Sequence, residues 1–582
     1  MIRNFILSIF LVTLLSGCDD FLDYTEHSFY DDPETIFSTF NRTRQFLGDI
    51  YSKLPTDYDY DGIGNNEPNQ SMRSAATDEA EYVKQNHDVQ KFTNGQWTAF
   101  KALDNNWSKY YGGIRAANFF LDQIEGRTFE DYQYNEDFDI EMERYEMYPY
   151  EARFLRAFFY MELAKRYGNV PMPEGVINDV SEVNSLPRES FEDVIAYIVS
   201  ECDAIGDELP VTWIGANFFQ ETGRVTRGAV YALKSRALLY AASPLHNSMN
   251  DLTKWEAAAA AANAFVTNAS FGYSFDGAYY NSSDMAQGVF NNRASAELIF
   301  ERRNTNSNLF EKANFPMGFE GANGNATCPS QNLVDAYQTT DGFDVVLTNG
   351  VWSAPGSSVF DPANPYDNRD PRLMQTIIVN GSTWKSTAVE TFTGGLNGLP
   401  LADATPTGYY LKKYVREDIN IAGSNSNTKE HAWVIFRLAE VYLNLAEALN
   451  EAYGPTTAPA GFTMDATMAL NMVRERGAVG LPAVTGLSQE QLRAAIIRER
   501  QVELAFEDHR FWDVRRWRLF DTSNANAVTE DIYGIEITNT DGTLSYSKKL
   551  VDDRLWDEKM YLYPIPYNET TINSNLGQNP GW

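Results

Sequence analysis

Cysteine and histidine are scarce in this chain of 582 residues, which contains three cysteines and five histidines. If Cys18, which directly follows an N-terminal leader, carries lipid, only Cys202 and Cys328 remain for a bridge, and nothing in the sequence shows that they meet. One bridge is too few for a disulfide framework, so packing must stabilise the fold. The histidines are scattered along the chain, at positions 27, 87, 246, 431 and 509.

Motifs of the common hydrolases and nucleotide-binding enzymes are also missing. The sequence contains no G-x-S-x-G nucleophile elbow, no H-E-x-x-H zinc motif and no P-loop. A secreted glycoside hydrolase uses two catalytic carboxylates. The chain has 80 Asp and Glu residues, so two that lie close in sequence do not identify an active site. The proximity of Asp78, Glu79 and Glu81 therefore carries no weight. We predict a protein that is not an enzyme, with the hydrolase as the competing class.

Positive charge is in short supply, with 47 Lys and Arg against 80 Asp and Glu and a net charge of −33. Nucleic acids and anionic membrane surfaces both require clustered, unpaired cations, so we exclude them as partners. A neutral ligand such as a sugar is unaffected by the acidic field.

Long apolar runs are confined to the N-terminus. Arg3 precedes an apolar stretch from Phe5 to Leu15, which is too short to span a bilayer as a helix. The following Leu-Ser-Gly-Cys resembles the lipobox of a bacterial lipoprotein. We predict that residues 1–17 are a signal peptide and that the mature chain begins with lipid-modified Cys18, on which a body without membrane spans is tethered.

Helical periodicity dominates two regions, residues 18–270 and 433–582. In the first, Gly168 is expected to end one helix, Thr226 to cap the next and Pro244 to end it. Small residues at the expected crossings, beside Tyr, Phe and Leu, are typical of tetratricopeptide-like hairpins. Residues 271–432 are instead rich in Gly, Asn, Ser, Thr and Pro. We predict a mainly α protein, with a helical-hairpin scaffold and a large irregular, loop-rich lobe.

The one arginine-rich stretch, residues 498–518, contains six arginines and five acidic residues. The charges nearly cancel, so it is not a nucleic-acid patch. Val502, Ala505, Phe506 and Trp512 would share an apolar face if the stretch were one helix. Glu503 and Glu507 would then lie within a turn of Arg500 and Arg510, the spacing of helical ion pairs. We assign the stretch to the scaffold.

This stretch, "IIRERQVELAFEDHRFWDVRRW", resembles the signature of the SusD/RagB family, outer-membrane lipoproteins that capture nutrients in Bacteroidetes. Other motifs of the family follow in chain order from the lipobox to the last residue. They include "AASPLHN", "SQNLVDAY", "DPRL", "GYYLKKY", "FRLAEVYLNLAEALN" and the terminal "YPIPYNETTINSNLGQNPGW".

The resemblance implies a tetratricopeptide-like scaffold whose partner is a SusC-like TonB-dependent barrel transporter, which the protein covers as a lid. It implies binding of a glycan without cleavage, and a lipid-anchored, surface-exposed position in the outer membrane. The acidic residues after Cys18 resemble a surface-export signal. Two alternatives stay open: an adaptor with little or no glycan binding of its own, and a binder of another nutrient such as peptide.

By position in the family, two segments are expected to hold the ligand. Aromatic faces would stack on the sugar and polar groups would meet its hydroxyls, although packing within the loops is the alternative for every ring. We place Trp97 and Trp107 in the core and keep Trp352 as a further candidate. The first segment, which also contains Tyr58 and His87, contributes Tyr60, Asp61, Arg73, Tyr82 and Asn86; the second, which also contains Phe310, contributes Phe315, Phe319 and Asn325.

A calcium loop is a further hypothesis for the first segment. Asp57, Asp59 and Asp61 match the alternating ligands that open an EF-hand loop. Pro68 stands where the closing glutamate belongs, and Glu67 comes one residue early. We therefore predict no metal or cofactor, and keep these aspartates as weak calcium candidates against a solvated acidic loop.

Overall fold

A computed structural model describes residues 33–58, 71–85, 87–214, 221–280, 288–290 and 292–582 of the chain. Within these ranges, no helix combines the length and the apolar character needed to cross a lipid bilayer. The predicted leader and the predicted lipidation site, Cys18, lie outside the described residues.

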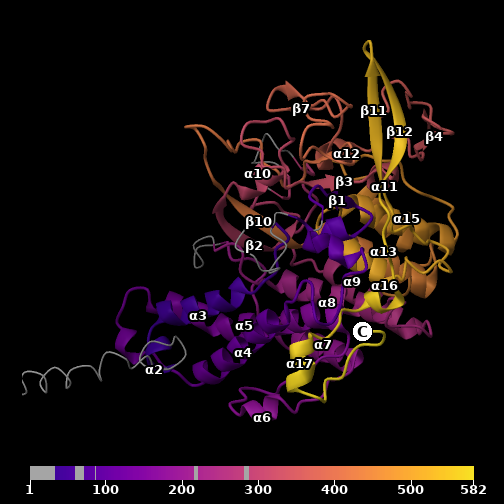
Figure 1. Ribbon diagram of the computed structural model, residues 1–582. Coiled ribbons are helices and arrows are strands. Elements are labelled where there is room, and N and C mark those ends of the chain that lie inside the picture. The colour runs from indigo at the N-terminus through magenta and orange to yellow at the C-terminus, as the bar shows by residue number, and fades with distance from the viewer. Residues whose placement is uncertain (1–32, 59–70, 86, 215–220, 281–287, 291) are drawn as a thin grey trace, which may run out of the picture.

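Six long helices follow one another through the first half of the chain and pack as successive neighbours (Figure 1). α4 lies against α5, α5 against α7, α7 against α8 and α8 against α9, while α3 covers α4 and α5. Their bounds are Phe40–Ser52 (α3), Trp107–Ile124 (α4), Phe138–Tyr167 (α5), Phe191–Ile205 (α7), Arg227–Ala242 (α8) and Leu252–Val266 (α9).

The C-terminal helices continue this stack. α13 (Leu438–Tyr453) packs on α8 and α9, and its other neighbours are α14 (Ala466–Arg474) and α15 (Gln489–Glu503). Both helix-rich regions thus build one scaffold, and the predicted mainly helical fold is confirmed. The shorter helices are α2 (Pro33–Ile36), α6 (Val180–Val183), α10 (Leu309–Asn314), α11 (Gln331–Ala336), α12 (Pro371–Thr376), α16 (Arg510–Arg516) and α17 (Tyr567–Ile572), with single turns at Arg73–Ala76 (η2), Asp88–Phe92 (η3), Glu130–Tyr132 (η4) and Glu558–Tyr561 (η5).

Local sequence explains where these helices begin and end. The Thr226 side chain accepts a hydrogen bond from the backbone N–H of Ala229 and caps α8, which ends before Pro244. Gly168, at φ +70°, ends α5. At the crossing of α4 and α5, a Cβ on Gly113 would lie 2.6 Å from the Phe159 ring. The predicted caps and the small residue at a helix crossing are confirmed.

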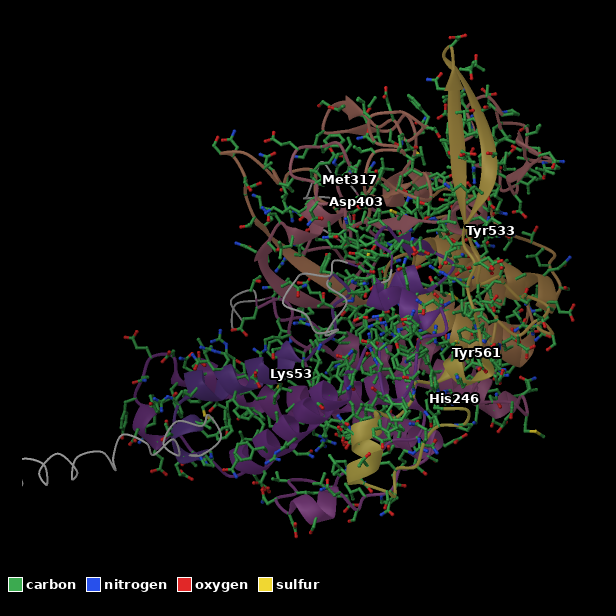
Figure 2. The ribbon with its side chains drawn as sticks, in the orientation of Figure 1. Lys53, His246, Met317, Asp403, Tyr533 and Tyr561 are labelled. Carbon is green, nitrogen blue, oxygen red and sulfur yellow. The ribbon has the colours of Figure 1, made fainter. Side chains whose placement is uncertain are left out.

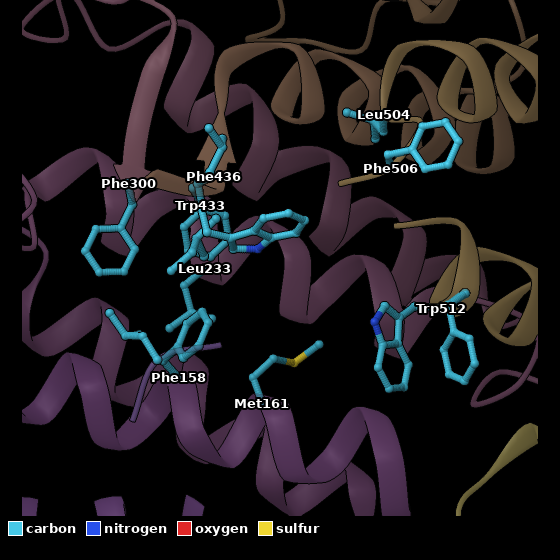
Figure 3. Packing of buried hydrophobic residues seen from close by; sticks show 14 of the residues in the cluster. Phe158, Met161, Leu233, Phe300, Trp433, Phe436, Leu504, Phe506 and Trp512 are labelled. Carbon is cyan, nitrogen blue, oxygen red and sulfur yellow. The ribbon is translucent and has the colours of Figure 1, made fainter. Parts of the chain in front are cut away.

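One part of the main core lies where the scaffold meets the base of the lobe (Figure 3). Phe158 of α5 meets Phe436 at 6.1 Å between ring centroids, and Phe300 stacks near Phe436 at 6.4 Å. Leu233 of α8 is fully buried beside them. The rings at 300 and 436 come from strands, so the same cluster fastens the lobe to the helices.

Most of the lobe lies in the chain between two strands, β2 and β10, which pair antiparallel with each other. Between them the chain forms only short strands and short helices, as its composition predicts. β1 pairs with β3, β4 with β5, β6 with β9, and β7 with β8. The bounds are Ala80–Tyr82 (β1), Leu298–Ser307 (β2), Thr327–Pro329 (β3), Val346–Thr348 (β4), Val351–Ser353 (β5), Ile377–Ile378 (β6), Thr383–Trp384 (β7), Thr387–Ala388 (β8), Tyr410–Leu411 (β9) and Lys429–Arg437 (β10).

A β-hairpin in the C-terminal region was not anticipated. β11 (Ile532–Thr540) and β12 (Thr543–Asp552) pair antiparallel, with one register shift between Ile532 and Tyr533, and project from the body of the protein (Figure 1). Asp541 and Gly542 join them in a two-residue turn with φ values of +50° and +86°. Asp-Gly between alternating residues is a recognised hairpin signal, so the sequence carried information that the helical interpretation overlooked.

The arginine-rich stretch is two helices and not one. α15 ends at Glu503 and α16 begins at Arg510, because Phe506 and Asp508 adopt positive φ values of +60° and +62°. The expectation of one shared helical face is therefore wrong, although Val502, Ala505, Phe506 and Trp512 are all buried.

The expected pairs of Glu503 and Glu507 with Arg500 and Arg510 are also wrong, because both glutamates bind cations from distant segments. Glu503 contacts Arg372, Arg437 and Arg476, and Glu507 contacts Lys413 and Arg437.

Arg510 also pairs outside the stretch, with Asp78 at 2.6 Å, whereas Arg500 and Arg516 both pair with Asp513 within it, at 2.9 and 2.7 Å. Arg500, Arg515 and Arg516 are likewise buried. The assignment of the stretch to the scaffold is confirmed.

Candidate functional site

The two segments expected to hold the ligand lie side by side, although about 240 residues separate them in sequence. β1 and β3 pair antiparallel, with Tyr82 opposite Thr327. One residue further on, the backbone N–H of Val83 donates to the Ala326 carbonyl at 3.1 Å. Ser330 continues the contact by donating its backbone N–H to the Glu79 carbonyl at 2.8 Å. This pairing carries the first segment to the edge of the lobe.

Two of the expected sugar platforms are buried by this arrangement. Tyr82 is 2% exposed, its ring lies 4.4 Å from that of His87, and burial raises the pKa of its hydroxyl. Phe315 is 1% exposed and packs edge-on against Trp384 at 5.3 Å. Neither ring presents an open face. Phe319 and Asn325 remain partly exposed at the surface.

Arg73 is also internal. Its guanidinium pairs with Asp104 at 3.2 Å and with Asp508, and its backbone N–H donates to both oxygens of Asp57, at 2.9 and 3.0 Å. The side chain is 2% exposed. A ligand at the surface cannot reach it, so we leave Arg73 out of the site. Its function here is to tie the first segment to the turn after α15.

The same contact bears on the calcium hypothesis. Asp57 is 1% exposed and its carboxylate is turned inward onto the Arg73 backbone, so it is not free to ligate an ion in a surface loop. Among the described residues, no group of three or more His, Cys, Asp and Glu side chains has a geometry that could hold a metal. The other expected residues, Asp59, Tyr60, Asp61 and Asn86, lie outside the described residues.

The remaining aromatic residues considered from the sequence are structural. Trp97 and Trp107 are buried, as predicted. Trp352 is 3% exposed and lies between Tyr366 and Tyr546, at 6.3 and 6.0 Å between centroids, so it is not a surface candidate. Tyr58, Phe310, Cys202 and Cys328 are buried too, and the two cysteines are free thiols whose pKa values are raised by burial.

A third segment, which the sequence did not indicate, completes the surface. Lys84 pairs through Nζ with Asp403 at 2.6 Å. The chain at Gly324 approaches so closely that a Cβ there would be 2.4 Å from the Asp403 Cβ and 3.2 Å from the Met317 sulfur; Figure 2 labels Met317 and Asp403 close together. We call this region the loop surface and define it by Lys84, Met317, Phe319, Asn325 and Asp403.

Two cavities of the described chain lie elsewhere, in the scaffold. One of about 480 Å³ is lined by the α8–α9 connection, α13, α15 and the segment after α16. Another, of about 310 Å³ and mostly apolar, lies between α4, the α5–α7 connection and α17. None of the expected ligand residues lines either cavity.

Burial of Glu79, which leads into β1, predicts a pH effect on stability. Desolvation and the neighbouring Asp78 raise the pKa of Glu79 from 4.5 to about 8, against the opposing effect of Arg510. Between these two values the native protein holds a proton that the unfolded chain releases, so this contribution to stability falls as pH rises from about 4.5 to 8. In Glu79→Gln the amide stays neutral, and we expect the melting temperature to fall less between pH 5 and 8.5 than in the wild type.

The matched control is Glu320→Gln, an exposed carboxylate of the second segment, which should leave the slope unchanged. Thermal melts across this pH range make the comparison. Identical slopes for Glu79→Gln and the wild type would contradict the assignment of a protonated Glu79.

The fold defines a class: a helical-repeat scaffold that carries an irregular, loop-rich lobe. The chain belongs to the SusD family. Residues 285–582 match the family model described as "SusD family", and residues 20–239 match the one described as "Starch-binding associating with outer membrane". The resemblance read from the sequence is therefore confirmed.

Individual relatives agree with this assignment. The chain is 27% identical over 454 residues to SusD-like protein P2 of Formosa agariphila, covering 74% of this chain and 73% of that protein. It is 25% identical over 560 residues to Starch-binding protein SusD of Bacteroides thetaiotaomicron, covering 87% and 84%. A solved SusD-like protein from Bacteroides fragilis has a TM-score of 0.74 at 26% identity, covering 94% of this chain and 98% of that one.

Proposed function

We propose that this protein is a glycan-binding lipoprotein of the cell outer membrane. It captures oligosaccharides or polysaccharides at the loop surface and delivers them, uncleaved, to a SusC-like TonB-dependent transporter. The observation that supports the proposal is the pairing of β1 with β3, which brings the two segments named from the sequence side by side. Membership of a family that includes a starch-binding protein supports the ligand class.

The chemistry of the loop surface suits an uncharged, hydroxyl-rich ligand. Phe319 offers a partly exposed ring for C–H faces, and Asn325 offers an amide to hydroxyls. Lys84 and Asp403 neutralise each other while keeping donors and acceptors at the rim, at 37% and 41% side-chain exposure. Because this ion pair is neutral as a whole, a ligand needs no net charge to bind beside it. Tyr60, Asp61 and Asn86 stay in the proposal as contacts from the first segment.

The anchor and the partner complete the proposal. Lipid on Cys18 would hold the protein at the outer membrane, exposed on the cell surface, in agreement with the outer-membrane association in the description of the family. The excess of acidic residues keeps nucleic acids and anionic membranes from competing.

Phe319→Ala tests the position of the site. Loss of one stacking ring should weaken glycan affinity by roughly three- to ten-fold, which corresponds to about 0.5–1.5 kcal/mol. The melting temperature should change by only a few degrees, because the ring is partly exposed already. The affinity is measured by isothermal titration with the best ligand from an array of plant, host and microbial glycans.

The matched control is Phe100→Ala, which removes a phenylalanine that is 79% exposed elsewhere on the chain. It should leave affinity unchanged. Tyr82→Ala is not an equivalent test, because the ring is buried and its loss should lower stability. Equal affinity of wild type and Phe319→Ala would show that the site is misplaced. A wild type that binds no glycan while it co-purifies with a barrel transporter would favour the adaptor instead.

A further inference from the structure

A short loop beside the loop surface exposes three leucines. It runs through residues 392–403, "FTGGLNGLPLAD". Leu396 is 65% exposed, Leu399 39% and Leu401 38%. A group of exposed aliphatic side chains in one loop is unfavourable in water unless something covers it. We call these three residues the leucine shelf.

Hydrogen bonds fix the shelf in place through its central residue, Asn397, which is 3% exposed. The Asn397 side chain donates to the Met317 carbonyl at 2.6 Å and accepts from the backbone N–H of Glu390 at 2.9 Å. Its own carbonyl accepts from the Tyr410 hydroxyl at 2.7 Å. These three hydrogen bonds hold the loop to the lobe, so the leucines are carried by a fixed backbone.

Two glycines let the loop pack this tightly. A Cβ on Gly395 would lie 2.6 Å from the Glu390 carbonyl oxygen, and one on Gly398 would lie 2.5 Å from the carbonyl oxygen of Phe392. Neither neighbour is the movable end of a side chain. Only glycine fits at these positions, so the turn that carries Leu396 and leads into Leu399 is held close to the lobe.

The shelf is continuous with the loop surface. The backbone at Leu396 contacts Gly318, where a Cβ would lie 2.6 Å from the Leu396 carbonyl oxygen, and Gly318 lies directly between Met317 and Phe319. At the other end, Leu401 precedes by two residues Asp403, the partner of Lys84. The shelf therefore adjoins the loop surface at both of its ends, beside Phe319 and beside Asp403.

Aliphatic side chains select a particular ligand chemistry. They bury methyl and methylene groups but offer no hydrogen bonds to hydroxyls and no flat ring for stacking. Three leucines cannot supply the roughly 800 Å² per partner of a stable protein interface. On the basis of the proposed function, we propose that the glycan bound here carries small apolar substituents, O-acetyl or O-methyl groups, which lie on the leucine shelf.

The test compares each neutral polysaccharide with its own deacetylated form. The probes are acetylated glucomannan and acetylated xylan, before and after mild alkali, titrated into the full chain. We expect the wild type to bind at least one acetylated form about four-fold or more tightly than its treated counterpart, the gain for burying about one methyl group. The double variant Leu396→Ser, Leu401→Ser should lose this preference and keep its affinity for the treated form.

Leu252→Ser, at a leucine 45% exposed at the start of α9, is the matched control and should behave as the wild type. Since all three leucines changed in these variants are exposed, melting temperatures should stay close together. A wild type that binds treated and untreated glycans equally, with Phe319→Ala still impaired, would overturn the shelf but not the proposed function. A preference that survives the double variant would also overturn it. No binding to these probes or to the wider array would contradict both proposals.

Discussion

Glu503→Ala is expected to lower the free energy of unfolding by about 3–5 kcal/mol, because it leaves buried cations without their counter-charge. Glu503 is fully buried at the end of α15. Its Oε1 lies 2.6 Å from Arg437 and 2.9 Å from Arg476, and its Oε2 lies 2.8 Å from Arg372.

The ionised state of Glu503 follows from these neighbours. Burial alone raises the pKa of its carboxyl, but the guanidiniums of Arg476, Arg437 and Arg372 outweigh it and hold the pKa well below its usual range. The native protein therefore keeps the negative charge until strongly acidic pH. By linkage, the stability contributed by this group is present above its ordinary pKa of 4.5 and is lost as pH falls below it.

The control lies in the same arginine-rich stretch. Arg498 pairs with Asp344 at 2.7 Å, but the side chains are 39% and 56% exposed. Water and salt screen such a pair, so Arg498→Ala should cost less than about 1 kcal/mol. Equilibrium unfolding in urea measures both variants. If their effects were similar, the buried network would not have the stabilising function assigned to it.

Trp512→Ala is the second change with a large expected effect, again about 3–5 kcal/mol. The side chain is 3% exposed and lies at the junction of α5, α16 and the C-terminal segment (Figure 3). Lys165 and Arg166 of α5 lie 4.5 and 4.9 Å from its ring centroid, and Tyr563 stacks beside it at 5.9 Å. Its indole N–H donates to Asp508 at 3.1 Å. Alanine would leave a cavity, and it would remove the N–H group that donates a hydrogen bond to the Asp508 carboxylate.

Two further variants separate these contributions. Trp512→Phe keeps much of the apolar volume but not the N–H donor, so its cost should fall between those of the wild type and the alanine variant. Tyr134→Ala, at a tyrosine 90% exposed, should change stability by less than about 0.5 kcal/mol. A near-neutral Trp512→Ala would refute the assignment of this stretch to the scaffold.

The candidate site was only half predictable. The sequence predicted two segments as ligand-binding, and the structure pairs these segments through β1 and β3. It did not reveal which side chains face outward: Phe319 stays at the surface, while Tyr82, Phe315 and Arg73 are internal. Arg73 lies in η2, and Phe315 and Phe319 follow α10 in a turn, so their exposure depends on which distant segments pack against them and not on local composition.

The sequence by itself determined the features that depend on a few adjacent residues. The threonine cap of α8, the glycine that ends α5, the net charge and the family signature all belong to this class. Only the tertiary structure decided that Glu503 binds three distant arginines, that Lys84 meets Asp403, and that the leucine shelf adjoins Phe319. Local hydrogen bonds and backbone preferences act over one turn of chain, whereas these contacts join segments tens to hundreds of residues apart and exist only once the scaffold has packed.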